Sequence, residues 1–151
     1  MDQVAVFRGN APAKIDDKAR LKIPTGFRGV LETQFGRDLF VTSLTGESVR
    51  IYPMPVWVEI ERKLAQIPST HPSRVRFFSR VNYYGQTAEL DNQGRVLIQA
   101  PLKQDAGIDG EVTVLGYGNY LHVQNAESIR KDVAQSIEAD LETLSQLWRN
   151  D

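Results

Sequence analysis

The chain has 151 residues, of which 41% are hydrophobic and 25% are charged, a composition typical of one compact soluble unit. It contains no cysteine, and its two histidines, His71 and His122, lack the spacing of a metal cluster, which excludes a disulfide framework and a structural zinc site. The N-terminal residues lack a long apolar segment, and no apolar run approaches the length of a membrane span. We therefore expect a cytoplasmic protein with no membrane partner.

Charge is distributed unevenly along the chain. Residues 1–89 carry 13 Lys and Arg against 9 Asp and Glu, whereas residues 90–151 carry 5 against 10. A net charge of −1 would argue against a nucleic-acid partner, but segregated charge leaves a basic face that can meet phosphates while the acidic part points elsewhere. The basic N-terminal part therefore keeps DNA among the candidate partners.

Two segments 75 positions apart carry nearly the same pattern. Residues 15–24 read IDDKARLKIP and residues 90–101 read LDNQGRVLIQAP. Each has an apolar residue, an aspartate, an arginine four positions later, and apolar alternation up to a proline. Each copy also leads into a short helix candidate, two strands and a longer helical pattern. The chain therefore reads as two copies of one unit, too few for a solenoid, which pack on each other.

Each copy predicts a β-hairpin around a tight turn. The predicted strands cover residues 14–16, 21–23, 87–90 and 96–98. Asp16 and Asp91 open type I turns whose last residue adopts a left-handed conformation. Gly94 suits that position, whereas the Cβ atom of Ala19 costs about 1 to 2 kcal/mol there. We therefore expect a slightly altered first turn.

Three longer helical patterns lie outside the repeated motifs. The first begins just after Pro55 and ends at Pro68, with an apolar stripe between them. A short helix with cationic and aromatic sides follows over residues 74–81. From Asn125, a good N-cap, apolar residues recur at steps of four and three as far as Leu147, which predicts one long amphipathic helix. A small barrel cannot cover its whole stripe, so we expect this helix to pack on a neighbouring subunit.

In this order, the elements resemble those of the MraZ family, bacterial regulators that belong to the AbrB-like (SpoVT-AbrB) DNA-binding superfamily. The resemblance is carried by Phe7-Arg8-Gly9, Asp16 to Pro24, Tyr52-Pro53 with Trp57, Arg74 to Phe78, and Asp91 to Ile98 with Ala106-Gly107. It runs from Phe7 almost to the C-terminus. The chain departs from the family pattern in two places, because Ala19 replaces a glycine and a few extra residues precede Phe7. The role of Asp2 to Val6 stays open.

The resemblance implies an α+β fold with a mainly β core, namely a pseudo-two-fold, swapped-hairpin β-barrel with flanking helices. The expected parts are a first repeat at 7–53, a helical insertion at 54–83, a second repeat at 84–124 and a C-terminal helix at 125–151. It further implies a ring-shaped homo-oligomer that binds direct repeats in double-stranded DNA and represses its own division and cell-wall operon. We expect the protein to associate with the nucleoid. We expect no enzymatic activity, cofactor, metal or small-molecule substrate.

The family's DNA-contacting segment maps here onto Asp16, Lys18, Ala19 and Arg20. Arg20 is the first choice for contact, because arginine can hold a phosphate or a guanine edge bidentately, whereas lysine serves as a point charge on the backbone. The candidate DNA-binding residues are Arg20, Lys18, Lys14, Arg8 and Lys22. The residues expected to shape the turns are Asp16, Ala19, Asp91, Gly94 and Arg95. Instead of contacting DNA, an arginine after a turn can form an ion pair with a neighbouring aspartate. This is the role expected of Arg95, which lies in the acidic half of the chain.

Two other functions compete with DNA binding. Asp16 and Asp91, one from each copy, would suit an aspartic-protease dyad, but the residues that follow them do not match that family's Asp-Thr/Ser-Gly pattern. The second alternative is an antitoxin-like or protein-interaction module, in which the long C-terminal helix grips a protein. A salt-dependent gel shift on the DNA upstream of its own gene separates a repressor from both.

Overall fold

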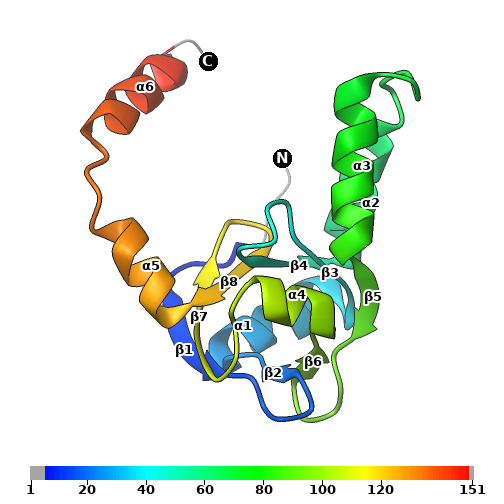
Figure 1. Ribbon diagram of the computed structural model, residues 1–151, viewed down its shortest axis with the longest axis vertical. Coiled ribbons are helices and arrows are strands. Elements are labelled where there is room, and N and C mark those ends of the chain that lie inside the picture. The colour runs from blue at the N-terminus through cyan, green and yellow to red at the C-terminus, as the bar shows by residue number, and fades with distance from the viewer. Residues whose placement is uncertain (1–5, 150–151) are drawn as a thin grey trace.

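A six-stranded and a two-stranded antiparallel sheet, flanked by helices, form the α+β fold of residues 6–149, the part that the computed structural model describes (Figure 1). The strands are β1 (Asn10–Lys14), β2 (Arg20–Lys22), β3 (Asp38–Thr42), β4 (Val49–Pro53), β5 (Gln86–Glu89), β6 (Arg95–Leu97), β7 (Glu111–Gly116) and β8 (Leu121–Asn125). The helices are α1 (Thr25–Val30), the π-helical turn η1 (Leu31–Phe35), α2 (Met54–Leu64), α3 (Pro72–Tyr84), α4 (Ala100–Asp105), α5 (Ala126–Val133) and α6 (Glu138–Arg149). Of the segment whose role was left open, residues 2–5 lie outside this range.

The strand order of the larger sheet is symmetric with respect to the two copies. It runs β1-β7-β8-β4-β3-β5, and it reads the same backwards once β1 is exchanged with β5, β3 with β7 and β4 with β8. Within the described residues, β1 and β5 are edge strands that do not pair with each other. The six-stranded sheet is therefore open, and the predicted closed barrel is not observed.

The repeated motifs form tight turns whose strands pair with the other copy, so the predicted hairpins are wrong in their pairing. β1 pairs with β7, and β2 pairs with β6 so that Leu21 lies opposite Val96. Within the first motif, the two arms meet in a single bridge between Ile15 and Leu21. Apolar alternation determines which face of a strand is buried, but it does not determine which other strand it pairs with. Here the exchange buries Leu21 and Val96 together in the core.

Both copies contribute to one apolar core. The short helix that follows each turn, α1 or α4, packs into this core through Phe27 or Leu102. Fully buried members from the two copies include Leu21, Ile23, Leu31, Leu39, Ile98, Leu102, Ile108 and Leu121. This shared burial holds the two turns in fixed positions.

A separate aromatic cluster anchors the α2–α3 pair to the sheet. Trp57 of α2 stacks on Phe40 of β3 with a centroid distance of 4.6 Å, and Val81 of α3 is fully buried beside them. Thr42 donates its hydroxyl to the carbonyl oxygen of Val81 at 2.6 Å. The predicted helix at 74–81 is confirmed and is longer than expected. Beyond this anchor, the two helices stand out from the sheets (Figure 1).

The predicted single C-terminal helix is wrong, because the structure breaks it into α5 and α6. Asn125 caps α5 as expected, with its side-chain oxygen accepting from the N–H groups of Glu127 and Ser128. Ser136 offers a second cap, since its hydroxyl oxygen lies 3.4 Å from the N–H of Glu138. Side chains of this kind compete with helical hydrogen bonds and end or restart helices. No helix among the described residues is both long and apolar enough to cross a bilayer.

His122 connects the sheet to α5 through a polar chain. Its Nε2 atom lies 2.8 Å from Oε1 of Gln124, whose amide donates to Ser128 and Asp132 of α5. The His122 Nδ1 atom is buried and has no hydrogen-bond partner among the described residues. Burial lowers the pKa of His122 below its ordinary value, and the hydrogen bond to Gln124 only partly opposes this. The imidazole is therefore held neutral in the folded protein.

We expect the free energy of unfolding to fall as the pH drops from 7 to about 5. A histidine with a depressed pKa takes up its proton first in the unfolded state, whose pKa is about 6.5, so stability is lost as pH falls below that value. Denaturant unfolding at both pH values measures the loss, and His122→Gln should reduce it. An equal loss in both proteins would contradict this origin.

Candidate nucleic-acid interface

The two turns share one hydrogen-bond pattern. Asp16 accepts the N–H of Lys18 and of Arg20 through Oδ1, both at 2.9 Å, and accepts Nε of Arg20 through Oδ2 at 3.0 Å. Asp91 does the same with Gln93 and Arg95, at 2.9, 2.8 and 3.0 Å. The backbone N–H of each arginine is the main reason why the pKa of its aspartate lies below the ordinary value. Each carboxylate thus serves its own turn, which leaves no shared protease-like dyad.

The first turn keeps its shape despite its alanine. The carbonyl oxygen of the aspartate accepts the N–H of Ala19 or Gly94 at 3.0 Å, and the φ angles are 63° and 78°. Ala19 is the one non-glycine residue among those described that has positive φ. The expected alteration of the first turn is therefore absent, and the strain remains in the Ala19 backbone.

Ala19→Gly should raise the free energy of unfolding by about 0.5 to 1 kcal/mol. Relief of about 1 to 2 kcal/mol of left-handed strain is offset by about 0.4 to 1 kcal/mol for a more flexible unfolded chain. Gly94→Ala is the matched control and should destabilise the protein, because its Cβ would also lie 2.8 Å from Cδ of Arg28. Denaturant unfolding measures both, and a destabilising Ala19→Gly would show that the turn carries no strain.

The second turn is covered by two arginines. Arg37 donates Nε to the carbonyl oxygen of Leu90 at 3.1 Å and Nη2 to that of Asp91 at 2.5 Å. Arg28 donates Nη2 to the carbonyl oxygen of Asn92 at 3.1 Å. Among the described residues, no side chain donates in this way to the carbonyl oxygens of residues 15–17 in the first turn. The carbonyl oxygens of the first turn are consequently not covered by side-chain donors, and in this sense the first turn is open.

The backbone explains why no arginine covers the first turn from the position of Arg37. The N–H of Leu90 donates to the carbonyl oxygen of Arg37, and the N–H of Ile15 donates in the same way to that of Gly110. Gly110 is therefore the structural counterpart of Arg37. Because glycine has no side chain, this position leaves the carbonyl oxygens of the first turn uncovered.

The residue of the second copy that corresponds to Arg28 does not cover the first turn either. Lys103 stands 75 residues after Arg28, at the same position of the second copy. Its Nζ atom lies 3.7 Å from Oδ1 of Asp109. A lysine also lacks the planar fork with which arginine donates to several acceptors at once. Around the first turn, a glycine and a lysine thus stand in place of the two arginines that cover the second turn.

The residues within and beside the two turns also differ in charge. The exposed residues Lys14, Lys18 and Lys22 of the first copy correspond, at the 75-residue offset, to Glu89, Gln93 and Leu97 of the second. The two turns have the same backbone shape, but they differ in charge and in the side chains that cover their carbonyl oxygens. The lysines of the first copy are cations suited to phosphates, whereas their counterparts are acidic or neutral.

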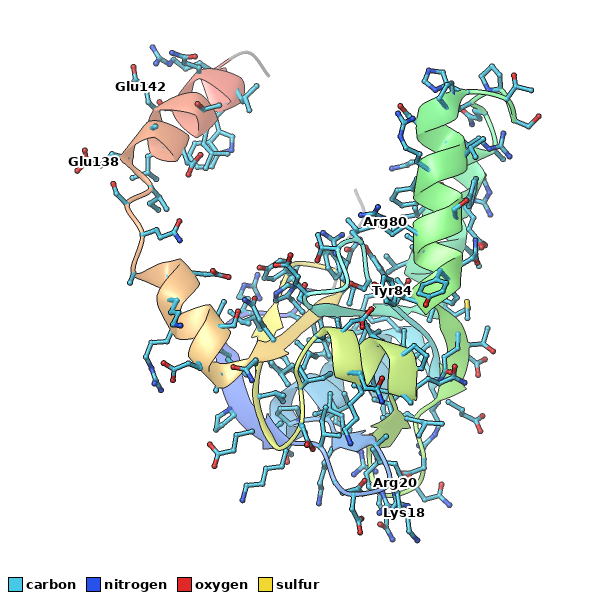
Figure 2. The ribbon with its side chains drawn as sticks, viewed as in Figure 1. Lys18, Arg20, Arg80, Tyr84, Glu138 and Glu142 are labelled. Carbon is cyan, nitrogen blue, oxygen red and sulfur yellow. The ribbon has the colours of Figure 1, made fainter. Side chains whose placement is uncertain are left out.

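The predicted DNA-binding residues do not form one cluster. Lys18 and Arg20 lie together at the end of the molecule away from α6 (Figure 2). Lys14 ends β1 opposite Glu111, and Lys22 lies opposite Arg95, beside the second turn. Arg8 precedes β1 and lines a hollow beside α1. The structure therefore brings together Lys18 and Arg20 at the first turn, with Lys22 two residues from Arg20 on β2, whereas Arg8 lies beside α1.

Arg20 is half-exposed and held in place. Its side chain is 31% exposed, and its Nε is bound to Asp16. Within residues 6–149, its two terminal nitrogens form no hydrogen bond. A guanidinium oriented in this way can still donate two parallel hydrogen bonds to a phosphate or to a guanine edge. Arg95 forms the same ion pair with Asp91, as expected of it, so pairing with an aspartate does not by itself separate the two arginines.

Sequence reasoning missed the roles of Arg28 and Arg37. Nothing in the local sequence distinguishes Arg28 from the other cations of the basic N-terminal part, and nothing links Arg37 to a turn that begins 53 residues away. Comparing the two copies position by position would have shown that Arg28 has a lysine as its counterpart. Among the described residues, no group of three His, Asp or Glu side chains could hold a metal ion.

Comparison with known proteins decides the family. A relative from Koribacter versatilis is 46% identical over 94% of this chain and 99% of its own length, and one from Acidobacterium capsulatum is 44% identical over 85% and 88%. The chain belongs to the MraZ family. A relative from Nitrosomonas europaea is 40% identical over 75% of this chain and 76% of its own length. All three are named "Transcriptional regulator MraZ", and the family model described as "MraZ protein, putative antitoxin-like" matches residues 85–146.

Proposed function

We propose that this MraZ family member is a sequence-specific DNA-binding transcriptional regulator whose first turn, residues 16–20, contacts the duplex. The proposal rests on the difference between the surroundings of two turns that have the same backbone shape. The first is open and surrounded by lysines, whereas the second is covered by Arg28 and Arg37. The names of the relatives support a role in transcription.

The proposed target is the DNA upstream of its own gene. By resemblance to the family, the chain represses its own division and cell-wall operon by binding direct repeats as a ring-shaped homo-oligomer. The exchange of strands between the copies supports the swapped-hairpin arrangement and the division into repeats at 7–53 and 84–124. Lys18 and Arg20 are the main contacts in this proposal, while Lys14, Lys22 and Arg8 are secondary.

A salt-dependent gel shift on the DNA upstream of its own gene tests this function. A regulator of this kind shifts that DNA, and its affinity falls with salt, since the logarithm of the binding constant drops by about 0.9 per neutralised phosphate for each unit of log salt. An unrelated DNA of equal length is the control. Equal binding to both DNAs at every salt concentration would contradict sequence specificity.

An antitoxin-like interaction module is the second candidate function. Two observations favour it, namely the description of the matching family model and the exposed apolar residues of α6. Such a module would bind a partner protein and leave the upstream DNA unshifted. The same gel shift therefore separates the two candidates.

A further inference from the structure

The helix α6 carries an apolar stripe that nothing in the described part of the chain covers. Every residue from Arg130 to Arg149 is exposed. The large apolar side chains on this stretch are Val133, Ile137, Leu141, Leu144, Leu147 and Trp148, and Trp148 is 68% exposed. Contiguous exposed apolar surface of this kind marks an interaction site. The stripe therefore needs a partner.

A surface of opposite charge lies on α3. A hollow of about 550 Å³ is lined by residues of α3 together with Thr45. Val75 and Tyr83 contribute apolar surface to its lining and are 48% and 72% exposed. Arg76 and Arg80 line the same hollow, and neither forms an ion pair with another described residue. The hollow is thus amphipathic and cationic.

The charges on α6 match those on α3 in spacing. Glu138 and Glu142 are four residues apart, as are Arg76 and Arg80, so each pair lies on one face of its helix. Each charged pair begins one position after an apolar residue of the stripe beside it, since Glu138 follows Ile137 and Arg76 follows Val75. Each charged pair therefore flanks its stripe on the same side. An antiparallel pairing of the helices brings such flanks together.

We propose that α6 of one copy docks antiparallel on α3 of a second copy of this chain. Glu138 would face Arg80 and Glu142 would face Arg76, which places Leu144 beside Val75 and Ile137 beside Tyr83. Within one chain, α3 and α6 stand on opposite sides of the molecule (Figure 1), and Figure 2 shows Glu138 and Glu142 on the side of α6 that faces away from α3. This contact rests on the self-association proposed above and names the surfaces that make it.

The contact is head-to-tail, because α6 of each copy meets α3 of the next. Contacts of this type close into rings or continue into filaments, whereas a two-fold contact would stop at a dimer. The first turn lies at the end of the molecule away from α6 (Figure 2), so this docking leaves Lys18 and Arg20 free.

Reversing the charges tests the contact. Variants Arg76→Glu/Arg80→Glu and Glu138→Arg/Glu142→Arg should each raise the concentration for half-assembly at least about tenfold, because lost ion pairs become like-charge contacts. The chain with all four substitutions, and an equal mixture of the two double variants, should regain the mass of the wild-type assembly. Light scattering after gel filtration measures the mass, and circular dichroism checks the fold.

Three outcomes would overturn the proposal: unchanged mass in either double variant, no recovery in the four-substitution chain, or a wild-type protein that is monomeric. Because the chain has no cysteine, Val75→Cys and Ser145→Cys, which lie about 3 Å apart along the helix axes in this register, provide a second measurement that needs no charge change. A mixture of these two proteins should form a mixed disulfide dimer, and its absence would count against the contact. Mass is measured without DNA, so failure here is distinguishable from failure of DNA binding, and an Arg20→Ala control should keep the wild-type mass.

Discussion

Replacing Arg20 with alanine should weaken binding to the upstream DNA about 100-fold at fixed salt. A bidentate arginine contact contributes about 1 to 3 kcal/mol, and at least two copies of the first turn engage the same DNA in the proposed assembly. Fluorescence anisotropy titrations on the upstream DNA measure this loss. The slope of affinity against salt should also become shallower, because fewer phosphates are neutralised.

Arg95→Ala is the matched control for this variant. Arg95 forms the same ion pair with its aspartate as Arg20, at the same distance of 3.0 Å and with similar exposure. Both variants should therefore lose similar stability, and only Arg20→Ala should lose DNA affinity. Equal losses of affinity in the two variants would show that the turns do not differ in function.

A monomeric variant that keeps Arg20 should bind the upstream DNA about 100- to 10,000-fold more weakly than the assembled protein. One copy offers few cations, whereas linked copies on successive repeats turn the later contacts into intramolecular ones. Glu138→Arg/Glu142→Arg, held below its raised half-assembly concentration, is a suitable variant, since both side chains are exposed and lie far from the first turn (Figure 2). Its added positive charges would by themselves strengthen DNA binding, so they cannot account for a loss of affinity.

A single-repeat DNA provides the control for avidity. On that DNA, the wild-type protein and the monomeric variant should bind with similar affinity, because only one turn can engage. Undiminished binding of the monomer to the full upstream DNA would refute the role of assembly.

The sequence was sufficient to predict the turns and most helices. The 75-residue offset correctly marked Asp16 and Asp91 as turn residues, and Pro55 and Asn125 marked two helix starts. These features are local, so the residues that determine them lie close together in the chain.

The partners of the strands could not be predicted in the same way. Alternation in β2 and β6 shows which side chains are buried, but the pairing of the two strands depends on the shared core. The break before α6 was missed because the apolar period continues through it, while Ser136 offers a local cap that the period does not reveal. The cover that Arg37 forms over the second turn likewise depends on tertiary structure.

Disulfide trapping on DNA tests most directly which turn contacts the duplex. Asp17→Cys and Asn92→Cys place single thiols at equivalent exposed positions of the two turns in a chain without other cysteines. Each protein is mixed with upstream DNA that carries a short thiol tether on its phosphates. We predict efficient trapping from position 17 and little from position 92. Equal trapping from both positions, or trapping from position 92 alone, would contradict the account.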